Sequence, residues 1–188
     1  MTKKVAIVQS NYIPWKGYFD LINMVDEFML FDDAQYTRRD WRNRNLIKTT
    51  NGLQWVTIPV EVKGKYFQKI NETRLSDPEW GKKHWATIVQ NYGKAKCFRE
   101  HRALFESLYL GCTEEYLSQV NYRFIREICV LLNITTRISW TMNYAAVEGK
   151  TERQSQVVPK TLKCGECGAM NLPTEWYCDR CGAELASL

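Results

Sequence analysis

The first third of the chain alternates short apolar runs with polar loops, and this pattern predicts an α/β fold. Residues 4–9 and Glu27–Phe31 are predicted to form two buried strands, and the apolar positions within 17–25 share one helical face. A strand, a helix and a second strand in this order are typical of a parallel sheet. Because ligands bind where such strands end, the segments 9–16 and 32–36 are expected to form part of a site.

Turn and capping residues predict the elements that follow. Asn51-Gly52 lies between two strand-like segments, 45–48 and 53–62, and is a strong hairpin signal. Asp77 followed by Pro78 is typical of a helix start, and this helix is expected to end near residue 92. The remaining predicted elements are helices at 99–110 and 113–133, the second capped by Thr113, and a strand at 136–142. The sequence therefore predicts a Rossmann-like parallel or mixed sheet with helices and an inserted β-hairpin.

Composition favours a folded, cytoplasmic protein with one core domain and a small module. The 188 residues are 45% hydrophobic and 13% aromatic, which is enough for a buried core. No apolar run is long enough for a signal peptide or a membrane helix. The predicted boundaries are 1–154 for an α/β domain, 155–162 for a polar linker and 163–188 for the module. The net charge is +5, and residues 161–188 are acidic, so the basic part is the α/β domain.

Four cysteines near the C-terminus carry the strongest chemical signal. Cys164, Cys167, Cys178 and Cys181 form two Cys-x-x-Cys pairs, a spacing typical of a tetrahedral zinc site. Gly168 follows one pair, where a tight turn needs a residue without a side chain. The alternative, two disulfides, suits a secreted protein, and nothing else in the chain indicates secretion. We therefore expect structural Zn²⁺ in a zinc ribbon, because four thiolates leave no open metal position.

The loop between the first strand and its helix is the first candidate ligand site. It offers amide, hydroxyl, indole and ammonium groups at a helix N-terminus, which suits an anionic or nucleotide-like ligand. The candidate substrate-binding residues in this loop are Gln9, Asn11, Tyr12, Trp15, Lys16 and Gly17. The alternative is that this aromatic loop only packs on the core.

An arginine-rich segment, 37–45, is the second candidate site. Its four arginines are interleaved with tryptophan and asparagine, so guanidinium groups could clamp phosphate while the indole stacks on a base or sugar. The candidate residues are Arg38, Arg39, Trp41, Asn43 and Arg44. The alternative is a solvated charged loop, the usual fate of such runs.

Two further segments contribute candidates with weaker signals. His84 lies in a predicted helix and is a candidate catalytic acid or base, although a packed or surface histidine is the commoner outcome. Thr151 and Arg153 follow Gly149 in a short segment that could form a phosphate-binding turn.

Together these segments resemble the WbqC-like protein family. The resemblance covers roughly residues 3–154, and its matching segments are Val5–Asp20, Phe31–Tyr36, Trp41–Asn45, Trp55–Val60, His84-Trp85, Tyr92 and Gly149–Arg153. Proteins of this family are associated with bacterial surface-polysaccharide (O-antigen) gene clusters, so the resemblance implies a pathway more firmly than a reaction.

The resemblance implies an enzyme that transfers a group to or from a nucleotide-activated sugar or a related phosphorylated donor. In this hypothesis Arg38–Arg44 hold the diphosphate, Gln9–Gly17 line the donor pocket and His84 carries a proton. Family members continue past Arg153 with another helix and strand, whereas the linker and ribbon follow here from Ser155. This difference predicts an exposed strand edge that a homodimer or the ribbon could cover.

The alternative function is a non-catalytic adaptor whose ribbon recruits a protein partner. Nucleic acid is the less favoured partner, because an acidic ribbon opposes phosphate binding. In addition, Leu162 stands where RNA-binding fingers commonly carry tryptophan. Trp176 and Tyr177 are the expected contact or packing residues of the ribbon.

Overall fold

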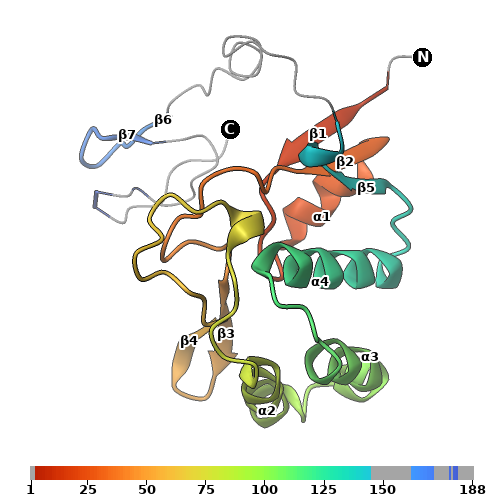
Figure 1. Ribbon diagram of the computed structural model, residues 1–188. Helices are drawn as coiled ribbons and strands as arrows, with labels where there is room; N and C mark the ends of the chain where they lie inside the picture. The colour runs from red at the N-terminus through yellow and green to blue at the C-terminus, as the bar shows by residue number, and fades with distance from the viewer. Residues whose placement is uncertain (1–2, 145–161, 172–177, 179, 182–188) are drawn as a thin grey trace. The chain divides into compact units, whose positions relative to one another are not determined.

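The computed structural model describes residues 3–144, 162–171, 178, 180 and 181, and the chain divides into two compact units, Met1–Ala145 and Ala146–Leu188. The first unit contains a parallel sheet, an antiparallel hairpin and the helices that surround them (Figure 1). None of the described helices is long and apolar enough to cross a membrane.

Three parallel strands form the central sheet, in the order β1 (Val5–Val8), β2 (Glu27–Leu30) and β5 (Arg137–Trp140). Val8 pairs with Leu30, and Leu30 pairs with Trp140, so the three strands end at the same edge of the sheet. Helix α1 (Lys16–Asn23) connects β1 to β2. The predicted strand–helix–strand opening is confirmed, and it brings the loops after the strands together.

One face of this sheet packs on two helices. Phe28 and Leu30 are fully buried against Ile22 of α1 and Ile125 of α4 (Leu117–Leu131). Figure 1 shows α1 and α4 on the same side of the sheet. The other face carries Val5 and Ile7, which are exposed. Within the described residues, the sheet is therefore packed mainly on one side.

The predicted hairpin forms strands β3 (Arg44–Thr49) and β4 (Gly52–Thr57). Gly52 has a φ of 103°, a left-handed conformation that glycine adopts without strain. Alternate residues such as Val56 point into the core, whereas Trp55 lies on the outer face. The second strand ends at Thr57, earlier than the predicted residue 62.

Helices α2 (Trp80–Tyr92) and α3 (Phe98–Leu110) pack against each other. Asp77 helps to start α2, because its Oδ1 accepts a 2.9 Å hydrogen bond from the backbone N–H of Glu79. A Cβ on Gly81 would lie 2.3 Å from the carbonyl oxygen of Tyr109, so glycine allows the two helices to approach closely.

The prediction for the last helix was wrong at its N-terminus. α4 begins at Leu117, and no side chain caps it, so Thr113 is not its cap. The chain before it is held in an extended conformation by a neighbouring segment: Leu75 N–H donates to Glu115 O, and Leu117 N–H donates to Thr73 O, both at 2.9 Å. Tertiary pairing therefore delays the helix by about one turn.

The second unit contains a short antiparallel pair, β6 (Leu162–Lys163) and β7 (Met170–Asn171). Gly168 has a φ of 72°, and its N–H donates to the carbonyl of Cys164 at 3.0 Å. The tight turn predicted after the first cysteine pair is therefore present.

Candidate functional site

A buried carboxylate joins the loops after the first two strands. Asp32, which follows β2, accepts hydrogen bonds from the backbone N–H of Ser10 at 2.9 Å and from the hydroxyl of Ser118 on α4. Asp32 is fully buried, and burial raises the pKa of its carboxyl above the usual value. The predicted site segments 9–16 and 32–36 are thus in direct contact through Asp32.

Arg42 holds the side chains of two predicted ligand residues. Its Nη1 donates to Asn11 Oδ1 and its Nη2 donates to Gln9 Oε1. Asn121 of α4 fixes the same segment by donating to the carbonyl of Arg42 at 2.9 Å. The amide oxygens of Gln9 and Asn11 are therefore bound within the protein, and Arg42, absent from the predicted set, organises this loop.

Tyr12 and His84 lie in an aromatic cluster of the core. Thr57 O, which can only accept, is 3.1 Å from His84 Nε2, so Nε2 carries a proton. Burial lowers the pKa of His84, so the ring is neutral and its Nδ1 accepts from Tyr12 Oη at 2.9 Å. Tyr109 Oη completes the chain at 3.0 Å from Tyr12 Oη. Both ring nitrogens of His84 are thus occupied, and its role as a proton carrier stays a prediction.

The arginine-rich segment forms one wall of a groove of about 250 Å³, whose other lining residues are largely apolar. Arg38 is fixed at its rim, since its Nη2 donates to the carbonyl of Val62 at 2.9 Å. Arg44 donates to the carbonyl of Arg39. The groove is lined by Tyr36, Arg38, Arg39, Asn43, Arg44, Thr57, Ile58, Pro59, Val60 and Val62. The structure therefore brings together four of the five candidates predicted in this segment.

Asn43 and Arg44 carry hydrogen-bonding capacity that the described residues do not use. Asn43 is 5% exposed, and its Nδ2 donates to Ile58 O at 2.8 Å. Its Oδ1, like the Nε of Arg44, has no hydrogen-bond partner in the described part of the chain. Buried polar atoms without partners are costly, but both atoms are inaccessible here, so a ligand could use them only if these side chains move.

Two tryptophans form an exposed platform beside the groove. The rings of Trp41 and Trp55 lie 5.1 Å apart, and they are 47% and 41% exposed. The guanidinium of Arg44 lies over Trp55, with Cζ 4.0 Å from the ring centroid. Trp55 was not among the predicted site residues. The alternation of the hairpin, which places Leu53 and Trp55 on one face, could have indicated it.

The start of α1 contains the other predicted loop residues. Trp15 is 55% exposed and directly precedes Lys16, the first residue of the helix. A Cβ on Gly17 would lie 2.0 Å from the ring of Trp15, so Gly17 lets the indole fold back over the helix start. Gly17 shapes this loop through that contact.

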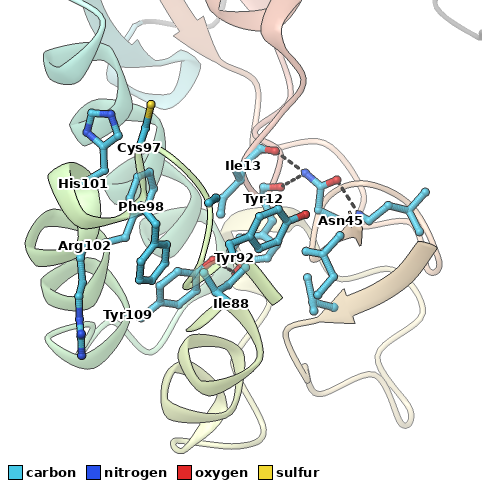
Figure 2. Close-up of a pocket in the computed structure, with 15 residues that line it drawn as sticks. Tyr12, Ile13, Asn45, Ile88, Tyr92, Cys97, Phe98, His101, Arg102 and Tyr109 are labelled. Carbon is cyan, nitrogen blue, oxygen red and sulfur yellow. Dashed lines mark hydrogen bonds between the residues drawn. The ribbon is translucent and has the colours of Figure 1, made fainter. Parts of the chain in front are cut away.

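A second cavity, of about 370 Å³, lies between α2, α3 and the hairpin and is mostly apolar (Figure 2). Ile88 and Tyr92 of α2 face Phe98 of α3 across it. On the hairpin side Asn45 donates to the backbone carbonyls of Tyr12 and Ile13, which ties the first loop to β3. The sequence did not predict this cavity, because its walls come from segments far apart in the chain.

The four cysteines of the second unit converge on one point. Their Sγ atoms all lie within 4.8 Å of one another, and they could hold a metal ion. Cys164 and Cys181 are 3.6 Å apart, and Cys167 and Cys178 are 3.5 Å apart, so they are thiols rather than disulfides. Four sulfurs at about 2.3 Å from a tetrahedral zinc would lie about 3.8 Å from one another, which these separations approach.

The pKa of one thiol in this cluster, Cys178, lies below its usual value. Burial disfavours the charge on Cys178, but hydrogen bonds from the backbone N–H groups of Cys181 and Arg180 and from neighbouring thiols outweigh it. Together they lower the pKa of Cys178 to about 6. Since a thiolate is the form that binds metal, this geometry favours metal binding.

A protein-family model and a mycobacterial protein match the chain. The model of the WbqC-like protein family matches residues 9–166. The chain belongs to the WbqC-like protein family. It is also 53% identical over 151 residues to the uncharacterized protein Rv1507c of Mycobacterium tuberculosis, covering 80% of this chain and 65% of that protein. No solved structure matches the chain.

The WbqC-like match extends further than the resemblance seen in the sequence. It ends at residue 166 rather than near 154, so it includes the linker and Cys164. Two predicted WbqC-like site residues, Thr151 and Arg153, lie outside the described residues, as do the predicted contact residues Trp176 and Tyr177.

Proposed function

We propose that this protein acts in bacterial surface-polysaccharide (O-antigen) biosynthesis, transferring a group to or from a nucleotide-activated sugar or a related phosphorylated donor in the cytoplasm. The observation that carries the proposal is the groove in which Arg38, Arg39, Arg44 and Asn43 converge. Guanidinium groups are the protein's best ligands for phosphate, because they donate paired hydrogen bonds and stay charged. Membership of the WbqC-like family supports the pathway.

In this proposal the arginines bind the phosphates and the neighbouring indoles receive a ring of the donor. Trp41 and Trp55 are exposed beside Arg44, where a base or sugar could stack. The loop Gln9–Gly17 is the other candidate segment of the donor pocket in this proposal.

His84 is the candidate proton carrier of the proposed reaction. Its Nδ1 contacts the hydroxyl of Tyr12, and Tyr12 lines the apolar cavity. A proton from His84 would therefore pass through Tyr12 into the apolar cavity, not directly into the arginine groove.

The test is calorimetric titration of the full chain with nucleotide sugars and with inorganic pyrophosphate. Arg44→Ala should weaken binding about ten- to a hundredfold, the range for a lost charge-assisted hydrogen bond. Arg44→Lys keeps the charge but not the paired donors, so it should recover only part of the loss. Arg99→Ala, an exposed arginine on α3, is the matched control and should bind as the wild type does.

Two results would count against the proposal. One is the absence of binding by every phosphorylated ligand in the panel. The other is binding that survives both Arg38→Ala and Arg44→Ala, since the groove would then not be the phosphate site.

A second function is favoured by the cysteine cluster. We propose that it holds structural Zn²⁺ in a zinc ribbon, because four thiolates leave no open position on the ion for chemistry. The cluster belongs to a separate compact unit, which favours an adaptor that recruits a protein partner. If the ribbon is only an adaptor, Cys164→Ser with Cys178→Ser should leave ligand binding by the full chain unchanged; lost binding would contradict a purely adaptor role.

A further inference from the structure

An exposed aromatic pair lies in the loop that follows β4. Tyr66 is 76% exposed and Phe67 is 82% exposed, more than any other large hydrophobic side chain in the described part of the chain. Their rings contact each other edge to face, with centroids 5.0 Å apart. Two adjacent aromatic side chains in water leave a large apolar surface uncovered, which is typical of an interaction site.

The same loop is basic. Lys63, Lys65 and Lys69 flank the aromatic pair and are exposed, and the segment 63–69 contains no acidic residue. Two acidic residues flank the loop: Lys65 pairs with Glu61 before it, and Glu72 after it accepts a 2.9 Å hydrogen bond from the backbone N–H of Lys69. Arg38 adds a further guanidinium at the base of the loop through its hydrogen bond to Val62 O. The surface around the aromatic pair therefore complements an anionic partner.

Hydrogen bonds hold this loop in shape. Gln35 Nε2 donates to Tyr66 O at 2.9 Å, and Gln68 Nε2 donates to Glu61 O at 2.7 Å. The backbone N–H of Tyr36 donates to Gln68 O at 2.9 Å. Gly64 makes the turn with a φ of 74°. The aromatic pair is thus presented on a fixed support, which lowers the entropy lost on docking.

We propose that the loop Lys63–Lys69, the aromatic–lysine loop, docks the protein on the surface of an anionic lipid bilayer. Aromatic side chains settle at the level of the lipid headgroups, and lysines are attracted to the negative surface. Neither feature alone is sufficient for stable binding, but apolar contact and charge attraction add. The docking does not depend on which ligand the arginine groove takes.

The test is co-sedimentation of the full chain with phosphatidylcholine vesicles that contain or lack phosphatidylglycerol. The wild type should bind only the anionic vesicles, and added salt should weaken the binding. Replacing Lys63, Lys65 and Lys69 by Gln should reduce affinity about fivefold for each lysine. Tyr66→Ser with Phe67→Ser should abolish binding.

Leu53→Ser is the matched control. Leu53 is 72% exposed at the tip of the hairpin, outside the loop, so this variant should bind as the wild type does. Circular dichroism of each variant checks that the fold is kept.

Several results would overturn the proposal. These are equal binding to both kinds of vesicle, binding by the aromatic variant at the wild-type level, and an equal loss in the Leu53→Ser control. Direct binding of RNA that is equally strong in the wild type and the aromatic variant, and lost in the lysine variant, would reassign the lysines to nucleic acid.

Discussion

Tyr12 is the centre of a buried hydrogen-bond chain, and Tyr12→Phe tests it directly. Its hydroxyl lies 2.9 Å from His84 Nδ1 and 3.0 Å from Tyr109 Oη. The three residues are 1%, 7% and 3% exposed, respectively, so water cannot readily replace a missing partner. The substitution keeps the ring and its edge-to-face contacts with Trp80 and Phe124.

The expected loss of stability follows from the atoms left behind. Removing the hydroxyl leaves His84 Nδ1 and Tyr109 Oη without that partner, and each buried unsatisfied group costs about 1–3 kcal/mol. We expect the free energy of unfolding to fall by about 2–4 kcal/mol, a large share of the roughly 5–15 kcal/mol typical of a folded domain. The melting temperature should fall by roughly 4–16 °C.

Urea unfolding followed by circular dichroism measures this loss. The double variant Tyr12→Phe/Tyr109→Phe should lose less than the sum of the two single variants, because the second change removes a hydroxyl that the first leaves unpaired. Tyr66→Phe, at an exposed position, is the control and should change stability by less than about 0.5 kcal/mol. A loss below about 0.5 kcal/mol in Tyr12→Phe would refute the stabilising role of this buried hydrogen-bond chain. His84 would then be available as an acid or base.

Three further predictions concern the metal, the sheet and the helix pair. Elemental analysis should find one zinc ion per chain, released in Cys164→Ser/Cys178→Ser; a metal-free wild type would contradict the four-thiolate site. Hydrogen bonds from Lys3, Tyr144 and Ser139 lower the pKa of Glu27 from 4.5 to about 2, so its stabilisation is present above pH 4.5 and lost as the pH falls towards 2. Glu27→Gln should flatten urea stability across that range, and an unchanged profile would exclude the contribution. Gly81→Ala should cost about 1–3 kcal/mol in urea unfolding, since its Cβ would meet a backbone oxygen; wild-type stability would show that the helices can separate.

Local signals predicted most of the elements. The strands at the start, the hairpin turn at Asn51-Gly52 and the helix after Asp77 were confirmed, since each depends on residues a few positions apart. The start of α4 was predicted wrongly, because its preceding residues pair with Thr73–Leu75 rather than with the helix.

The structure brings only some of the candidate site residues together. Arg38, Arg39, Asn43 and Arg44 do line one groove. Gln9 and Asn11 instead bind Arg42, which lies 33 and 31 positions away in the chain. No short window of sequence contains such a pair, so the use of their side chains could not be read from the loop alone.

The sequence by itself determined the order of strands and helices along the chain, the hairpin, the reduced cysteine cluster and the family. Each of these depends on spacing, turn residues or motifs within short segments of the sequence. Only the tertiary structure decided which polar groups remain available. It brought His84 into contact with Tyr12, 72 positions away in the chain, and Ser118 into contact with Asp32, 86 positions away. A side chain's burial and partners depend on segments that meet only in the folded chain, and these partners set its pKa and its capacity to bind a ligand.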